Sequence, residues 1–291
     1  MPSMSRSTIR DAAVALAFAS ALAGAMTTRA EEPWRPARLS DGQPDVQGDW
    51  DPEVTGTFDL TDPRAGGGRL EEIQREQQGI AHVRKPSRVV DPPDGKIPYR
   101  PEAAAKQKTL AEHADTPAAP EHIDPQARCL AGGVPREMFH SQLRIIQAPG
   151  QVIVLNAQNH VFRIIPLDGR PHIGPRTKLW MGDSRGRWEG TTFVVDVTNQ
   201  NAKGRLDMVG NFSSDNVHVV ERWEFLDANT LNYRATIDDP TVYTRPWTIA
   251  STFVRGRRGQ GQEYWEDACH EGERSADAMI IPTIATSTPS R

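Results

Sequence analysis

The stretches Val217-His-Val-Val-Glu-Arg-Trp-Glu-Phe225 and Leu231-Asn-Tyr-Arg-Ala-Thr-Ile237 decide the fold class of this chain. In the first, Val217, Val219, Trp223 and Phe225 share one face, and in the second the odd-numbered residues form an apolar face. Alternation with a period of two is typical of a β-strand that buries one side. We therefore expect two strands joined by a short polar loop.

Further segments with strand patterns surround this pair, and short turn-forming sequences such as Pro149-Gly150 separate several of them. No helical pattern intervenes, which disfavours βαβ units and a nucleotide-binding parallel sheet. The sequence predicts a mainly β fold over 137–291, an antiparallel meander that forms a lipocalin-like barrel or half-barrel. A flattened β-sandwich is the alternative. The other expected strands are 144–148, 151–156, 161–167, 192–198, 245–254 and 262–269.

The preceding segment, 31–136, differs in composition, because it contains 14 of the 23 prolines. Proline and glycine at this density break regular elements and favour turns and extended segments. Short helices are expected only at 69–81 and 102–114. With few apolar residues for a core of its own, the segment is predicted to be an arm packed on the barrel.

Composition excludes several classes of protein. The chain has 291 residues, with 34 Lys+Arg against 38 Asp+Glu and a net charge of -4. These values are typical of a globular protein, and they lack the overall excess of basic residues that is typical of nucleic-acid-binding proteins. We expect a small-molecule partner, no nucleic-acid partner and no particular oligomeric state.

Residues 1–30 have the features of a secretory signal. Arg6 and Arg10 form a basic start, and an apolar run of 15 residues follows at 12–26. That run is shorter than the roughly 20 residues needed to span a bilayer, which disfavours a membrane anchor. We therefore expect cleavage after Ala25 or Ala30, a periplasmic or secreted protein, and no membrane span afterwards.

Export bears on the two cysteines, Cys129 and Cys269, because an even pair in an oxidising compartment is expected to form a disulfide. Metal sites need ligands at fixed spacing, and the sequence has no H-E-x-x-H, H-x-H or C-x-x-C motif. We therefore expect no metal and no cofactor.

A set of motifs spread over nearly all of the chain after residue 30 resembles an uncharacterised family of exported bacterial proteins. The resemblance implies export and a single folded unit, but no activity. Glu273 departs from the pattern, since relatives carry Asn there. The motifs include Leu39-Ser-Asp-Gly-Gln-Pro-Asp-Val-Gln-Gly-Asp-Trp50, Ile165-Pro-Leu-Asp-Gly-Arg-Pro-His172, Gly182-Asp-Ser-Arg-Gly-Arg-Trp-Glu-Gly190 and Cys269-His-Glu-Gly272.

One of these motifs matches the hydrolase pattern G-x-S-x-G at Gly182, Ser184 and Gly186. That pattern supports catalysis where a helix follows the serine, and here the chain continues toward a predicted strand instead. We expect a turn at this position and no serine nucleophile.

The candidate site begins with Arg163, which shares strand parity with Val161, Ile165 and Leu167. A guanidinium on an inward face requires an acidic partner or an anionic ligand. His160 joins the same cavity only if the chain bends there. The predicted catalytic residues are His160, Arg163, Tyr233, Asp238 and His270, and the predicted ligand-binding residues are Arg245, Trp247 and Glu271.

Three functions remain open. The first is a metal-independent acid–base enzyme of the isomerase, lyase, cyclase or hydrolase type that acts on a small, partly apolar molecule. The second is a lipocalin-like binding protein without chemistry. The third is a structural protein of the cell envelope. A barrel fold alone does not distinguish them.

Overall fold

The computed structural model describes residues 34–53, 59–62, 77–79, 86–114, 116–159 and 161–256. All of them belong to one compact unit, Trp34–Arg291, and the other unit, Met1–Pro33, lies outside the described residues. The predicted signal segment, most of the predicted helix 69–81 and the predicted strand 262–269 therefore also lie outside them.

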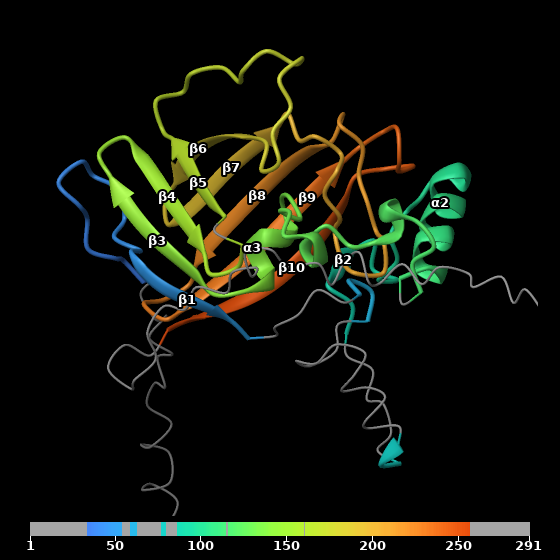
Figure 1. The fold of residues 1–291 in the computed structure, drawn as a ribbon. Coiled ribbons are helices and arrows are strands. Elements are labelled where there is room, and N and C mark those ends of the chain that lie inside the picture. The colour runs from blue at the N-terminus through green and yellow to red at the C-terminus, as the bar shows by residue number, and fades with distance from the viewer. Residues whose placement is uncertain are drawn as a thin grey trace, which may run out of the picture. The chain divides into compact units, whose positions relative to one another are not determined.

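A single ten-stranded sheet dominates the described part (Figure 1). Its main path runs β5-β4-β3-β1-β10-β9-β8-β7-β6, and every ladder is antiparallel, while β2 pairs with β10 beside that path. The mainly β, barrel-like prediction is confirmed. The strands are β1 (Gly48–Pro52), β2 (Val89–Asp91), β3 (Leu143–Ala148), β4 (Gln151–Asn156), β5 (Phe162–Pro166), β6 (Asp183–Glu189), β7 (Thr192–Thr198), β8 (His218–Phe225), β9 (Thr230–Asp238) and β10 (Trp247–Arg255).

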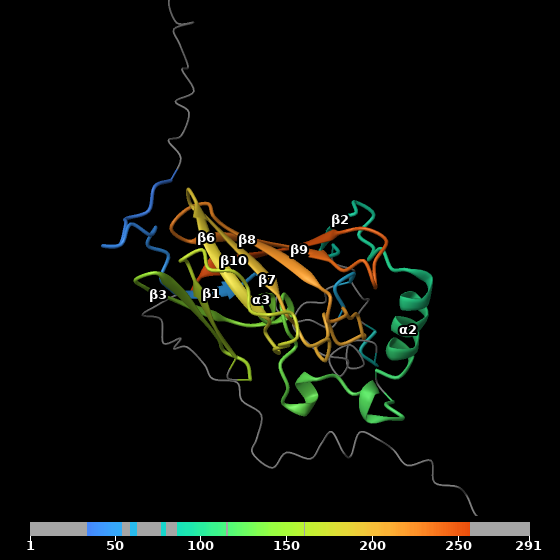
Figure 2. The same cartoon turned by 90° about the horizontal axis from the view of Figure 1, so that it is seen from above.

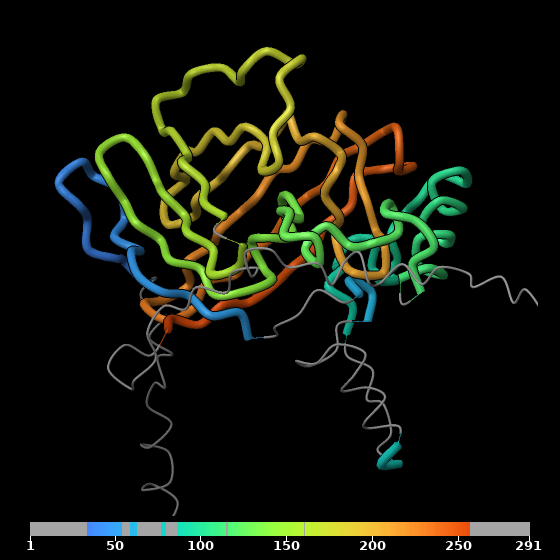
Figure 3. Tube along the Cα trace, in the orientation of Figure 1, coloured from blue at the N-terminus to red at the C-terminus, as the bar shows by residue number. Residues whose placement is uncertain are grey.

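The strands β6 to β10 follow the predicted meander, but β1 interrupts it. This strand comes from the proline-rich segment and pairs with β3 on one side and β10 on the other. The tube in Figure 3 shows how the N-terminal segment enters the sheet between strands that are far away in sequence. The segment 31–136 therefore contributes the strands β1 and β2 to the sheet, in addition to the loops and short helices beside it.

Alternating burial along the strands follows the alternating sequence. In β9 the residues Leu231, Tyr233, Ala235 and Ile237 are all fully buried, and their neighbours face outward. The sheet curves around this apolar face (Figure 2), which large aromatic side chains fill. The fully buried ones include Trp50, Phe193, Trp223, Phe225, Tyr233, Trp247 and Phe253.

The sheet nearly closes where its two end strands, β5 and β6, approach each other. A Cβ atom on Gly186 of β6 would lie 2.8 Å from Ile165 of β5 and from the ring of Phe193. Arg163 also donates a hydrogen bond across this seam to Ser184 Oγ, over 2.8 Å. Gly182 precedes β6 with a left-handed backbone, but Ser184 and Gly186 of the motif, predicted to lie in a turn, are part of the strand, where their small size allows the ends of the sheet to meet.

Short helices lie beside the sheet (Figure 1). The helix α2 (Pro101–Glu112) agrees with the prediction for 102–114, and α3 (Arg136–His140) follows the 3₁₀ turns η1 (Pro120–His122) and η2 (Gln126–Arg128). Proline at the first position of α2 suits a helix start, since that position needs no amide donor. Among the described residues, no helix is both long and apolar enough to cross a membrane.

Candidate functional site

A buried charge network lies inside the curved sheet, and it contains two of the predicted site residues. Arg163 donates to both carboxylate oxygens of Glu221, over 3.0 and 2.6 Å. Tyr233 donates its hydroxyl hydrogen to Glu221 over 2.8 Å. Burial, together with the Glu221 carboxylate, raises the pKa of Tyr233 far above its ordinary value, so this phenol stays neutral.

Glu221 is the acidic partner that the position of Arg163 requires. Both side chains are almost completely buried, at 2% and 0% exposure. The sequence contained a signal for this partner, because Glu221 has the same strand parity as Val219 and Trp223 and therefore faces inward with them. The charge of Arg163 is thus balanced within the protein itself.

The other predicted site residues in the described part lie elsewhere. Asp238 is at the end of β9, on the face opposite to Tyr233, where it is half-buried. Arg245 is exposed and pairs with Asp91. Trp247 is buried against Tyr243, with ring centroids 5.3 Å apart. The structure brings Arg163 and Tyr233 together and leaves these three residues outside that network.

Four predicted residues, His160, Cys269, His270 and Glu271, lie outside the described residues. The other cysteine, Cys129, is exposed at the end of η2 with a left-handed backbone (φ 59°). The disulfide between Cys129 and Cys269 therefore stays a prediction.

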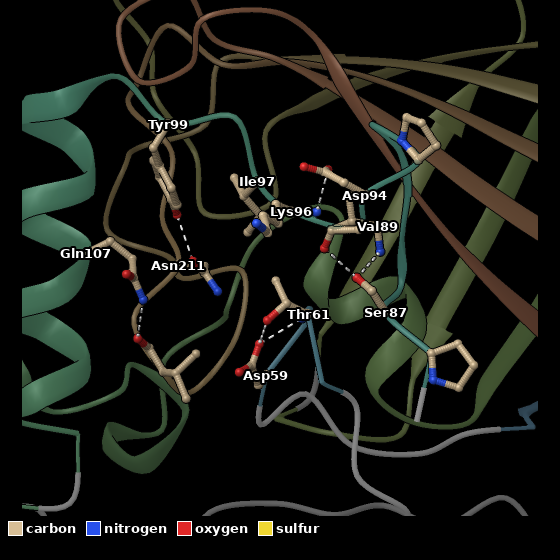
Figure 4. Close-up of a pocket in the computed structure, with 14 residues that line it drawn as sticks. Asp59, Thr61, Ser87, Val89, Asp94, Lys96, Ile97, Tyr99, Gln107 and Asn211 are labelled. Atoms are coloured by element: carbon tan, nitrogen blue, oxygen red, sulfur yellow. Dashed lines mark hydrogen bonds between the residues drawn. The ribbon is translucent and has the colours of Figure 1, made fainter. Parts of the chain in front are cut away.

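A pocket of about 880 Å³ opens beside β2 and α2 (Figure 4). It is lined by Asp59 and Thr61, by residues of the segment 86–99, by Gln107 of α2 and by Val209 and Asn211 of the loop before β8. This volume is within the range of about 300–1,000 Å³ that is typical of small-molecule sites. These residues come from segments far apart in sequence, so no local motif could predict the pocket.

A hydrogen-bonded chain leads from the pocket wall into the protein interior. The Tyr99 hydroxyl donates to Asn211 Oδ1 over 2.9 Å, and the Asn211 side-chain amide donates in turn to Asp207. Asp207 also accepts from the backbone amides of Asn211 and Leu60. Burial raises the pKa of Asp207 to about 7 in spite of these donors. Asn211, which lines the pocket, is therefore hydrogen-bonded to a buried carboxyl group whose pKa lies near neutral pH.

A second buried polar cluster surrounds α3. Arg136 is fully buried and donates to both oxygens of Asp124, over 2.7 and 3.1 Å. Burial raises the pKa of the neighbouring Glu137, whereas burial and then the Arg136 charge lower the pKa of His140 to about 3. The Arg136–Asp124 pair joins α3 to the segment before it, so we assign this cluster a structural role.

The described ranges contain no candidate metal site, because no group of three or more His, Cys, Asp or Glu side chains in them is placed to bind an ion.

Comparison with known proteins gives no guide to function either. No family model matches the chain, and neither the curated proteins nor the solved structures contain a match. Function must therefore be inferred from the geometry alone.

Proposed function

We propose that this protein is an exported small-molecule-binding protein whose ligand occupies the pocket between β2 and α2. The observation that carries the proposal is a pocket of ligand size whose wall, at Asn211, is hydrogen-bonded to the buried Asp207. The lining mixes polar and apolar residues, and a pocket with convergent polar groups beside a group of strongly shifted pKa is a typical binding-site arrangement.

The interior of the sheet is the less favourable location for a ligand. Arg163 and Tyr233 both donate to Glu221 there, only Arg163 Nε of these three side chains lacks a partner among the described residues, and large aromatic side chains surround them. A ligand that bound among them would have to replace strong charge-assisted hydrogen bonds. In the pocket, by contrast, no ion pair between described residues has to be broken to admit a ligand.

Export is the part of the proposal that rests on sequence. The basic start and short apolar run of residues 1–30 support delivery to the periplasm or the medium. The ligand would then be a molecule that is available outside the cytoplasm.

Acid–base catalysis is a second candidate, and Asp207 favours it. A general acid or base works best with a pKa near the working pH, and the value of about 7 meets that condition. Asp207 is fully buried behind Asn211 and does not itself line the pocket, so catalysis by this carboxyl requires the Asn211 side chain to move aside and let a substrate reach it.

A screen of small polar fragments by saturation-transfer NMR tests the binding proposal. Gln107→Trp would fill the pocket from α2, whereas Lys108→Trp places the same ring on an exposed position of the helix that does not line it. We expect fragments to bind the wild type and Lys108→Trp, and to lose binding to Gln107→Trp. Equal binding to all three proteins would contradict the proposal.

A further inference from the structure

The polar groups of the pocket fall into two classes, those already used within the protein and those still available. Tyr99 donates to Asn211, and Asn211 donates to Asp207. Ser87 donates to backbone carbonyls and accepts from the amide of Val89. These groups form the wall of the pocket and have little hydrogen-bonding capacity left for a ligand.

Two carboxylates keep part of their capacity. Asp59 accepts through Oδ1 from the amide and the hydroxyl of Thr61, over 2.7 and 2.8 Å. Asp94 accepts through Oδ1 from the amide of Lys96, over 3.1 Å. In the described part of the chain, the Oδ2 atom of each carboxylate has no hydrogen-bond partner. An ionised carboxylate only accepts, and both side chains are accessible to water, so a ligand seated in the pocket must replace that water with donors of its own.

The remaining available groups are one ammonium and one amide. Lys96 is exposed at the rim of the pocket, and Gln107 donates one amide hydrogen to the carbonyl of Val209, which leaves its second amide hydrogen and its Oε1 atom available. The available acceptors are the Oδ2 atoms of Asp59 and Asp94 and Oε1 of Gln107, whereas the ammonium of Lys96 is the one cationic donor among the described lining residues. The charges of Asp59, Asp94 and Lys96 sum to an excess of negative charge, which disfavours an anionic ligand.

Apolar groups lie between these polar ones. Val89, Ile97 and Val209 line the same pocket, together with two prolines. A suitable ligand must therefore present several O–H or N–H donors at its edge and C–H groups on its faces. A purely apolar molecule would leave the carboxylates desolvated without a partner, which is costly.

We propose that the ligand is a saccharide-like molecule, rich in hydroxyl groups and carrying no negative charge, whose hydroxyls donate to Asp59 and Asp94. This inference rests on the proposed function, because it assumes that the pocket is the binding site. A pyranose ring has the required arrangement, with hydroxyls around its edge and C–H groups on its two faces.

Titration calorimetry with glucose, glucosamine, a neutral disaccharide and glucuronate tests the inference on the full mature protein. We expect saturable binding of at least one of the first three and at least tenfold weaker binding of glucuronate, which carries a carboxylate on a similar ring. Equal or tighter binding of glucuronate would overturn the inference, and so would the absence of binding by all three uncharged or aminated sugars.

Variants locate the interaction. Asp59→Asn and Asp94→Asn should each weaken sugar binding about tenfold, which is 1.4 kcal/mol. Asp168→Asn, at an exposed ion pair with Arg170 outside the pocket, should leave it unchanged. Equal affinity of all three variants and the wild type would overturn the assignment of the carboxylates.

The fragment screen separates this inference from the proposed function. Fragments that bind and are excluded by Gln107→Trp, combined with no sugar binding, would refute the ligand class and leave the pocket assignment intact. Failure of both fragments and sugars would refute the pocket assignment as well.

Discussion

Arg163 and Glu221 form an ion pair inside the curved sheet, with 2.6 Å between Arg163 Nη2 and Glu221 Oε2. Arg163 lies on β5, at one end of the sheet, and Glu221 lies on β8, beyond the opposite end strand β6 and its neighbour β7. The same guanidinium also reaches Ser184 on β6. One side chain therefore links strands that no ladder joins.

Removal of one partner of this pair should destabilise the protein. Glu221→Gln leaves the Arg163 charge buried without its counter-ion, and such losses typically cost about 3–5 kcal/mol. Chemical denaturation should show that loss in the free energy of unfolding. The control is Asp168→Asn at the exposed Arg170 pair, which should change the free energy of unfolding far less, because solvent screens this pair. A similar small effect for Glu221→Gln would refute the closing role of the pair.

Closure of the sheet also depends on Gly186. In Gly186→Ala the new Cβ would lie 2.8 Å from Ile165 and Phe193, closer than real contacts allow. Overpacking of this kind costs about 1–3 kcal/mol, so we expect a lower Tm. Gly174→Ala is the matched control, because no atom lies within 4 Å of its Cβ position. Equal Tm values for the two variants would show that the seam tolerates a side chain.

The Asp207 carboxyl predicts a specific pH dependence of stability. Its pKa rises from 3.8 to about 7 on folding, so between these values the folded state binds a proton that the unfolded state has released. The contribution of this group to stability is therefore fully present below about pH 4 and is lost as pH rises to about 7, by roughly 4 kcal/mol.

Denaturation of the wild type and Asp207→Asn across this range measures that contribution. The difference in unfolding free energy between the two proteins should change in favour of the variant as pH rises from 4 to 7. A difference that does not depend on pH would contradict the raised pKa of Asp207.

Much of the fold could be predicted from sequence, because alternating apolar residues are sufficient to indicate strands such as β8 and β9. Three strands were not predicted, and one of them, β2, has only three residues, too few to show alternation. The strand β6 has too few apolar residues to alternate, since Ser184 and Gly186 occupy its inward positions. The strand β1 is only five residues long, and it is defined by pairing with β3 and β10, which are remote in sequence.

The candidate site was less predictable. Strand parity grouped Arg163 and Tyr233 with apolar residues of their strands, and both are buried in the structure. The same rule applied to Glu221 would have predicted their partner. The pocket is different, because Asp59 and Asn211 are separated by about 150 residues and meet only in the folded chain. Neither residue spacing nor hydrophobic periodicity can predict a contact between such remote segments.

The central claim is that a small molecule binds between β2 and α2, and side-chain amide NMR tests it most directly. Gln107 and Asn211 line the pocket, whereas Gln147 is buried away from it and hydrogen-bonded to Gln43. We predict that a bound fragment or sugar shifts the amide signals of Gln107 and Asn211 and leaves that of Gln147 unchanged. Binding that leaves the side-chain amide signals of both Gln107 and Asn211 unshifted would contradict the account.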